Sequence, residues 1–432
     1  MIRRAYSLLA ALLGPAVWLR LHWRGRREPL YRTSMGERFG RYQGPNAPGW
    51  VWIHAVSLGE TRAAASLVEA LRKIDPSLRL LLTHGTATGR AAGAALLRPG
   101  DRQAWLPWDS AGATRRFFAQ HRPRIGVLIE TEVWPNLLHS ARAANVPVVL
   151  ANARLSERSR RRGERLRAVM RPVARSLALV LAQTEADAVR LRAAGAREVA
   201  VCGNLKFDMT PAPDQLALGQ RWRDAVGRTV VLAASTREGE EAELLAAWAA
   251  QPGPRPLLLV VPRHPQRFDE VAALVQSAGF SLARRSAWSD LPSPEALAAE
   301  VWLGDSMGEL PLYYALAQVA LLGGSFAPLG GQNLIEAAAC GCPVLMGPHT
   351  FNFAQAAELA LAAGAARRVS SMSEAVALAC EPLSLAQRRD QFACCLTFAA
   401  QHRGAAQRMA VRIAALMKAT GTGESHVVEP DA

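Results

Sequence analysis

Short apolar runs alternate with longer amphipathic stretches along most of the chain, from residue 51 to residue 346. This rhythm predicts buried parallel strands joined by helices. The predicted strands of the first half are residues 51–56, 78–83, 102–106, 125–130, 146–151, 178–183 and 199–202. Those of the second half are residues 229–235, 256–262, 301–304, 319–322 and 344–346, and helical sequence follows at 385–419.

Residues 204–213 interrupt the rhythm and contain two prolines, which indicates a linker between domains. A chain of 432 residues is also too long for a single core. We therefore expect an α/β protein with two Rossmann-like domains, at residues 31–210 and 211–418, the second ending in closing helices. Residues 419–432 are a predicted loose tail.

The first 30 residues have a pattern of their own. Residues 5–23 are mostly apolar, with arginines on both sides. The uninterrupted apolar length is about 15 residues, whereas a bilayer span needs about 20. A marginal single span, a helix in the membrane interface and a buried helix all remain open. The flanking positive charge favours a membrane-anchor helix over residues 1–30, because it binds anionic lipid.

Charge narrows the choice of partners. The chain has 51 Lys and Arg against 36 Asp and Glu, a net charge of +15. Such an excess suits nucleic acid, anionic lipid or a phosphorylated substrate. Aromatic residues are only 6% of the chain and no nucleic-acid-binding signature is present, so we expect no nucleic acid partner.

The six cysteines do not form a spaced set of metal ligands, and a chain of this size needs no disulfide framework. We therefore expect reduced thiols in a cytosolic compartment. Cys340 and Cys342, on either side of a glycine, are interpreted as small packing residues.

The stretch from residue 319 to residue 346 carries the most specific pattern. A predicted strand ends at the glycine pair 323–324, and a loop leads to a second glycine pair at 330–331. Asn333 then precedes a predicted helix that begins at Leu334. The N–H groups of a helix N-terminus suit a phosphate. Glu336, in the first helical turn, suits the hydroxyls of a ribose. An ordinary crossover with a flexible loop is the alternative, but the order of these residues resembles the donor site of nucleotide-sugar glycosyltransferases.

Ser57 and Glu60 stand at another strand-to-helix junction. A helix N-terminus lowers a carboxylate pKa, and an ionised glutamate in a cleft can take a proton from a sugar hydroxyl. The same Ser-x-x-Glu spacing fits a capping box, in which both side chains bond only to the backbone. Spacing alone favours the capping interpretation.

Glu130 and Glu132 stand at the end of the predicted strand at 125–130 and share one face of the chain. Ligands bind at such strand ends in open α/β sheets. A metal site is one interpretation, but two carboxylates alone are weak evidence for it. Pairing with arginines such as Arg142 or Arg154 is the other.

Two cationic features also allow two interpretations each. The arginine-rich run at residues 152–162 is either a solvated helix face or an acceptor-binding patch for phosphate groups. Lys206, near the domain junction, either stabilises an anionic group in the expected interdomain cleft or forms a bridge to Asp208.

In the second half, polar residues follow four predicted strands in turn. Because the carboxyl ends of parallel strands lie at one edge of a sheet, they predict a nucleotide site there. These residues are Arg237, Arg263, His264, Glu309, Asn333 and Glu336.

Taken together, the motifs resemble the 3-deoxy-D-manno-octulosonic acid (Kdo) transferases of lipopolysaccharide synthesis, from about Gly36 to beyond Cys395. The resemblance implies a GT-B fold of two facing Rossmann-like domains, with CMP-Kdo as the donor and a tetraacyl lipid A precursor as the acceptor. It also implies an N-terminal anchor to the inner membrane, with catalysis on the cytoplasmic side and no metal or cofactor.

The resemblance further assigns roles by position. It makes Glu60 the catalytic base, against the capping interpretation, and makes Glu130 and Lys206 the stabilisers of the transition state. It implies CMP contacts at Arg263, His264, Met307, Gly308, Glu309, Asn333, Leu334, Ile335 and Glu336. A GT-B transferase with a UDP-sugar donor and a non-enzymatic basic membrane-surface protein remain as rivals.

Overall fold

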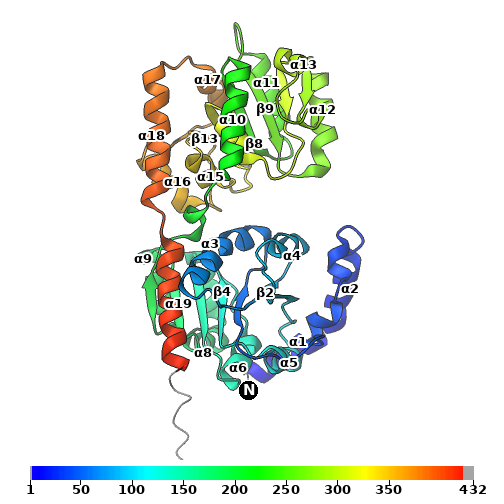
Figure 1. Cartoon of the computed structure of the whole chain (residues 1–432), viewed down its shortest axis with the longest axis vertical. Helices are drawn as coiled ribbons and strands as arrows, with labels where there is room; N and C mark the ends of the chain where they lie inside the picture. The colour runs from blue at the N-terminus through cyan, green and yellow to red at the C-terminus, as the bar shows by residue number, and fades with distance from the viewer. Residues whose placement is uncertain (1, 422–432) are drawn as a thin grey trace, which may run out of the picture. The chain divides into compact units, whose positions relative to one another are not determined.

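A computed structural model describes residues 2–421 of the chain. The chain divides into two compact units. Unit 1 comprises residues up to Asp208 and those from Arg403 on, and unit 2 is Met209–His402. Each unit contains a parallel sheet flanked by helices (Figure 1). Residues 419–421 end a helix, and the rest of the predicted tail, from residue 422, lies outside the described residues.

The seven-stranded sheet of unit 1 has the order β3-β2-β1-β4-β5-β6-β7, and each of its strands overlaps a range predicted from the sequence. The strands are β1 (Val51–His54), β2 (Leu80–His84), β3 (Arg102–Trp105), β4 (Ile125–Ile129), β5 (Val148–Ala153), β6 (Leu179–Ala182) and β7 (Val199–Val201). The helices between them are α3 (Leu58–Ile74), α4 (Ala87–Ala94), α5 (Ala111–His121), α6 (Pro135–Ala143), α7 (Glu157–Arg165), α8 (Arg167–Arg175) and α9 (Glu185–Ala194). Buried side chains on both faces of this sheet form two cores, as expected for a parallel sheet covered by helices.

The seven-stranded sheet of unit 2 has the order β10-β11-β9-β8-β12-β13-β14. Its strands are β8 (Val230–Thr236), β9 (Leu257–Pro262), β10 (Leu282–Arg284), β11 (Val301–Leu303), β12 (Val319–Leu322), β13 (Val344–Met346) and β14 (Ala366–Arg368). The sequence did not predict β10 and β14, the two edge strands. Each has three residues, ends in arginine and is not fully buried, so neither forms an apolar run.

One helix of unit 2 precedes β8, and the others lie between the strands or after the last one. They are α10 (Pro213–Val226), α11 (Glu240–Ala249), α12 (Phe268–Ser277), α13 (Pro294–Ala298), α14 (Leu310–Leu316), α15 (Leu334–Ala339), α16 (Ala354–Ala362), α17 (Met372–Cys380) and α18 (Leu385–Gln401).

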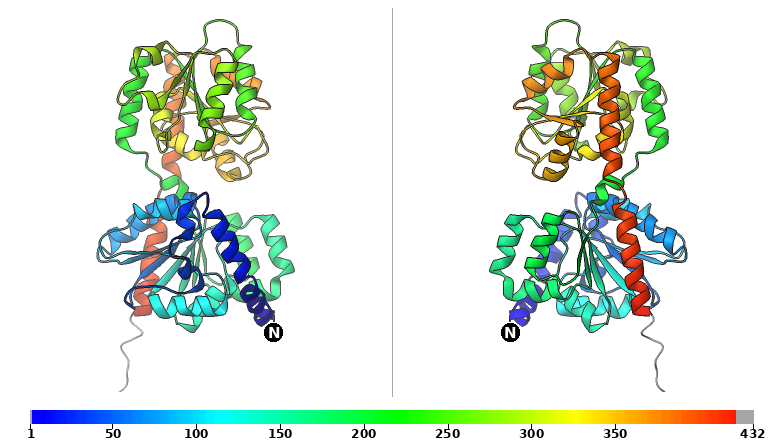
Figure 2. Two further views of the ribbon diagram at one scale, coloured as in Figure 1. Left: turned by 90° about the vertical axis from the view of Figure 1, so that its right-hand side faces the viewer. Right: turned by 90° about the vertical axis from the view of Figure 1, so that its left-hand side faces the viewer.

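The last helix, α19 (Ala405–Gly421), belongs to unit 1, although the sequence assigned residues up to 418 to the second domain. It lies along α3 (Figure 2). Met409 and Ile413 of α19 are fully buried in the same core as Leu67 and Leu71 of α3. Sequence periodicity shows that α19 has an apolar face but not which sheet that face covers.

Two helices replace the single N-terminal helix expected for residues 1–30. They are α1 (Ile2–Leu12) and α2 (Gly14–Arg24), and Pro15 lies in the first turn of α2. Proline suits that position because its missing N–H would have no partner there. Between residues 2 and 421, no helix combines the length and apolar character needed to cross a bilayer.

Candidate functional site

Glu60 lies in the first turn of α3, directly after β1. Ser57 is the N-cap, and its hydroxyl oxygen accepts the Glu60 N–H at 3.4 Å. The Glu60 carboxylate in turn accepts the Val56 N–H at 2.8 Å and the Ser57 hydroxyl at 3.0 Å. Both side chains therefore cap the helix, although Glu60 bonds to Val56 and not to the N-cap N–H of a standard capping box. These bonds fix the carboxylate at the end of the strand.

The expected lowering of the Glu60 pKa is wrong. Burial disfavours the charged carboxylate and raises its pKa to about 7, against the opposing bond from the Val56 N–H. The carboxylates of Glu130 and Glu132 raise it further by repulsion, and the Ser57 hydroxyl opposes them. A carboxylate with a pKa near 7 is suited to accept a proton at neutral pH.

Glu130 follows β4 and forms an ion pair with Lys206, which lies in the segment after β7. The Glu130 Oε1 and Lys206 Nζ atoms lie 3.1 Å apart, and both side chains are largely buried. Glu130 has a φ of +65°, a conformation that costs a non-glycine residue roughly 1–3 kcal/mol and that clusters at functional sites. The structure therefore brings Glu60, Glu130 and Lys206 to one region of unit 1.

The neighbouring acids have other partners. Glu132 accepts the indole N–H of Trp134 at 2.8 Å, and Asp208 accepts the N–H groups of Gly404 and Ala406 at the start of α19. Across residues 2–421, no group of three His, Cys, Asp or Glu side chains is arranged to hold a metal ion.

Asn152 supports Lys206 and was not identified from the sequence. It is fully buried in β5 with a φ of +53°, where the pairing register of β5 with β6 shifts. Its side-chain oxygen accepts the Leu205 N–H at 3.0 Å, next to Lys206. An asparagine within an otherwise apolar strand was the available signal, because Asn tolerates the left-handed conformation.

In unit 2, Arg263 and His264 follow β9 and are partly exposed. Burial lowers the pKa of His264, and the positive charges of Arg237 and Arg263 lower it further. The His264 ring therefore stays neutral at pH 7 beside two guanidinium groups. This cluster can attract an anion.

Glu309 makes several contacts within unit 2. Its carboxylate accepts two bonds from Arg285, at 2.9 and 3.0 Å, one from Tyr313 at 2.9 Å, and a short one from Ser306. These donors hold the Glu309 pKa below its usual value although burial acts in the opposite sense. The adjacent Met307 and Gly308 are exposed, and Gly308 has a φ of +86°.

Asn333 is the N-cap of α15 and accepts the Ile335 N–H at 3.2 Å. Leu334 and Ile335 are 1% exposed, so their side chains belong to the core and only their backbone can meet a ligand. Glu336 lies in the first turn and is partly exposed.

The glycine loop, residues 323–332, joins β12 to the N-cap of α15. The N–H groups of Gly324, Phe326 and Ala327 in this loop are donated to the carboxylate of Glu240. The sequence did not identify Glu240, because the two segments are far apart along the chain. Cys340 and Cys342 are buried nearby, and burial raises the pKa of both thiols, that of Cys340 to about 12.

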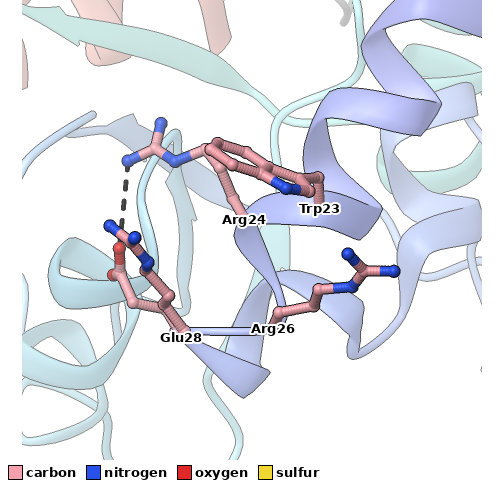
Figure 3. Close-up of a pocket in the computed structure, with 5 residues that line it drawn as sticks. Trp23, Arg24, Arg26 and Glu28 are labelled. Atoms are coloured by element: carbon pink, nitrogen blue, oxygen red, sulfur yellow. Dashed lines mark ion pairs between the residues drawn. The ribbon is translucent and has the colours of Figure 1, made fainter.

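The N-terminal helices form a second candidate surface. Large apolar side chains there are exposed, among them Leu12 at 69%, Leu19 at 63% and Trp23 at 61%. At the end of α2, a pocket of about 340 Å³ is lined by Trp23, Arg24, Arg26, Arg27 and Glu28 (Figure 3). Arg24 and Glu28 form an ion pair at 3.9 Å across it.

Residues 33–209 match the family model described as 3-deoxy-D-manno-octulosonic-acid transferase (kdotransferase). A 3-deoxy-D-manno-octulosonic acid transferase of Bordetella pertussis is 49% identical over 422 residues, covering 94% of this chain and 97% of the relative. The chain belongs to the Kdo transferase family. It is therefore an enzyme, a glycosyltransferase. The Kdo transferase of Haemophilus influenzae is 34% identical, over 89% of this chain and 91% of that relative.

Among solved structures, Anabaena Alr3699/HepE in complex with UDP is similar to this Kdo transferase with a TM-score of 0.57. The identity is 16%, over 86% of this chain and all of that one. Such a likeness concerns the fold alone. With the two parallel sheets, it confirms the predicted α/β fold of the GT-B class.

Proposed function

We propose that this Kdo transferase moves Kdo from CMP-Kdo to the tetraacyl precursor of lipid A, with inversion at the anomeric carbon. Membership of the family supports Kdo transfer. The observation that supports the mechanism is Glu60, a fixed and partly buried carboxylate whose pKa lies near 7.

In the proposed reaction, Glu60 removes the proton from a primary hydroxyl of the acceptor glucosamine. The hydroxyl oxygen attacks the anomeric carbon of Kdo, the bond from that carbon to the CMP phosphate breaks, and CMP leaves with its electron pair. Direct displacement by the acceptor inverts the anomeric configuration. Glu130 and Lys206 stabilise the transition state as a charged pair held in a protein environment.

Unit 2 supplies the donor site in this proposal. Arg263 and His264 meet the CMP phosphate or sugar, while Met307, Gly308 and Glu309 form a loop against the nucleoside. The α15 residues Asn333, Leu334, Ile335 and Glu336 complete the site. The exposure of Met307 and Gly308 supports contact through the loop surface, because the Glu309 carboxylate already has partners inside the protein.

We also propose that unit 1 binds the cytoplasmic face of the inner membrane through α1 and α2. Exposed leucine and tryptophan side chains lie there, and Arg20, Arg26 and Arg27 are exposed near the end of α2, a composition typical of helices that lie in the membrane interface. Packing of α1 on α8 brings this surface next to the arginine-rich α7 and α8. Those arginines suit the phosphate groups of a lipid A precursor.

The decisive experiment uses purified protein, CMP-Kdo and a tetraacyl lipid A precursor, with the lipid products identified by mass spectrometry. We expect lipid bearing Kdo and release of CMP, and inhibition by CMP at concentrations where UDP has no effect. Inhibition by UDP alone would favour a UDP-sugar donor instead.

The matched variants are Glu60→Gln and Glu69→Gln, both on α3. Removing the base is expected to lower kcat by about 10²–10⁴-fold, the usual range for general base catalysis. Glu69 is exposed on the same helix, so its variant should retain wild-type activity. Near-normal transfer by the Glu60 variant would exclude Glu60 as the base.

A further inference from the structure

Glu240 is a buried carboxylate at the start of α11, with a relative exposure of 2%. It accepts the N–H of Arg237 at 2.9 Å, within its own turn. It also accepts the N–H groups of Gly324 at 2.7 Å, Phe326 at 3.2 Å and Ala327 at 3.3 Å. One side chain thus joins the segment after β8 to the glycine loop after β12.

This link lies where ligands bind in sheets of this kind. The strands β9 and β12 lie on opposite sides of β8. The strands that follow β8 in the chain are therefore first added on one side of it and then, from β12 on, on the other side. Ligands of open α/β sheets bind outside the carboxyl ends of the strands at such a switch point. Glu240 lies at this edge but is covered by the protein.

The glycine loop needs such a link. Gly324, Gly330 and Gly331 have positive φ angles, so this segment loses much conformational freedom when it is ordered. A Cβ atom on Gly323 would lie 2.2 Å from the carbonyl oxygen of Ser235, which requires glycine where the loop leaves the sheet. A few residues further on, the chain reaches Asn333 at the start of α15.

We propose that Glu240 is a positioning residue for the nucleotide donor, an inference that rests on the CMP donor proposed above. Its carboxylate occupies N–H groups that would otherwise attract an anion, and it holds the loop in one conformation. Asn333 and Glu336 are therefore in place before the donor binds, and the donor phosphate depends on other groups. Pre-organisation of this kind strengthens binding because less ordering is needed on association.

The test compares Glu240→Gln with Glu243→Gln. Glu243 is exposed in the same turn of α11, so its variant is the matched control. Gln has the shape of Glu but lacks the charge, and its NH₂ group replaces one of the two oxygens that accept the N–H groups. Loss of charged hydrogen bonds predicts an increase of about tenfold in the Kd of CMP and the KM of CMP-Kdo. Because Glu240 does not touch the reacting atoms, kcat should stay within about threefold.

Amide hydrogen exchange provides a second measurement. In Glu240→Gln, the loop N–H groups that face the new NH₂ group, either that of Gly324 or those of Phe326 and Ala327, should exchange about tenfold faster than in the wild type, since they lose their acceptor. If this variant does not fold, the same measurements are made on Glu240→Asp. Its shorter side chain reaches fewer donors, so the changes in CMP affinity and in loop exchange should be intermediate.

Unchanged CMP affinity and unchanged loop exchange in a folded variant would overturn the role of Glu240. A fall in kcat with unchanged KM would also overturn it, because that result places Glu240 in the chemical step. Failure of the wild-type protein to bind CMP would contradict the proposed donor instead, and the exchange rates would then decide whether Glu240 holds the loop.

Discussion

The Glu60 carboxylate accepts two hydrogen bonds that favour its anion, yet burial and two neighbouring carboxylates outweigh them. Lys206 lies against Glu130 and compensates one of those negative charges. The charge state of Glu60 therefore depends on residues in the segments after β1, β4 and β7, which no single stretch of sequence contains.

The first prediction is a pH profile. Glu60 has a pKa of about 7, so the ionised fraction rises as pH increases through 7, and kcat/KM should rise with it to a plateau. Glu132→Gln removes one carboxylate that raises this pKa, so the midpoint should move to lower pH. The measurement is the initial rate of CMP release between pH 5 and 9, chosen to bracket an ordinary and a raised carboxylate pKa.

Glu69→Gln should leave the midpoint in place, since Glu69 is exposed and pairs with Lys73. A midpoint near the ordinary carboxylate pKa, or one that Glu132→Gln does not lower, would contradict the assignment.

At the scale of elements, polar contacts fix how α1 faces the rest of unit 1. The Tyr6 hydroxyl donates to Asp109 at 2.8 Å, and the Ser7 hydroxyl donates to Asn136 at 2.7 Å. The indole N–H of Trp108 donates to the Ala10 carbonyl at 2.6 Å. The Asp109 carboxylate is largely buried, and burial raises its pKa to about 6. Because this side of α1 is bound to the protein, the leucines of the opposite side are left exposed.

This orientation predicts membrane binding through those leucines. Leu12→Ser should weaken binding to vesicles containing anionic phospholipid by about tenfold, since burial of a leucine contributes about 1.5–3 kcal/mol. The control is Leu385→Ser in unit 2, an equally exposed leucine at 74% against 69% for Leu12. The measurement is co-sedimentation with vesicles at two salt concentrations. Equal binding by both variants would contradict a membrane role for α1.

At the scale of the whole molecule, the chain passes from unit 1 to unit 2 and returns. Asp208 accepts N–H groups at the start of α19, so the last segment before unit 2 is joined to the first helix after it. Unit 1 therefore lacks part of its core until α19 has been synthesised. Unit 2, by contrast, is one continuous segment.

Ile413→Ala should destabilise unit 1 although Ile413 follows unit 2 in the sequence. Its side chain is fully buried in the core of unit 1, where such a truncation costs about 2–5 kcal/mol. Hydrogen exchange should accelerate in β1 and α3 and stay unchanged in β8 and β12, with CMP affinity retained. Val411→Ala, at an exposed position of the same helix, should change stability by no more than about 0.5 kcal/mol. Faster exchange in unit 2 alone would contradict this assignment of α19.

The local pattern of apolar and polar residues determined most of the strands, the family and the fold class of this protein. The alternation of short strand-like runs with helical stretches predicted every strand of unit 1 and the inner strands of unit 2, and most of these are continuous apolar sequence because buried parallel strands are covered on both faces. The motifs from Glu60 to Glu336 indicated the Kdo transferase family and the GT-B fold, which the relatives and the two sheets confirm. The short edge strands β10 and β14 escaped prediction because their exposed arginines break the apolar pattern.

Only the tertiary structure decided which groups the charged side chains contact and which core the last helix covers. It paired Lys206 with Glu130, buried Glu240 against the glycine loop, added α19 to unit 1, and raised the Glu60 pKa where a helix N-terminus predicted a lower one. The physical reason is common to all four. Periodicity and spacing report on residues a few positions apart, whereas ion pairing, desolvation and core packing depend on residues that folding brings together from distant parts of the chain.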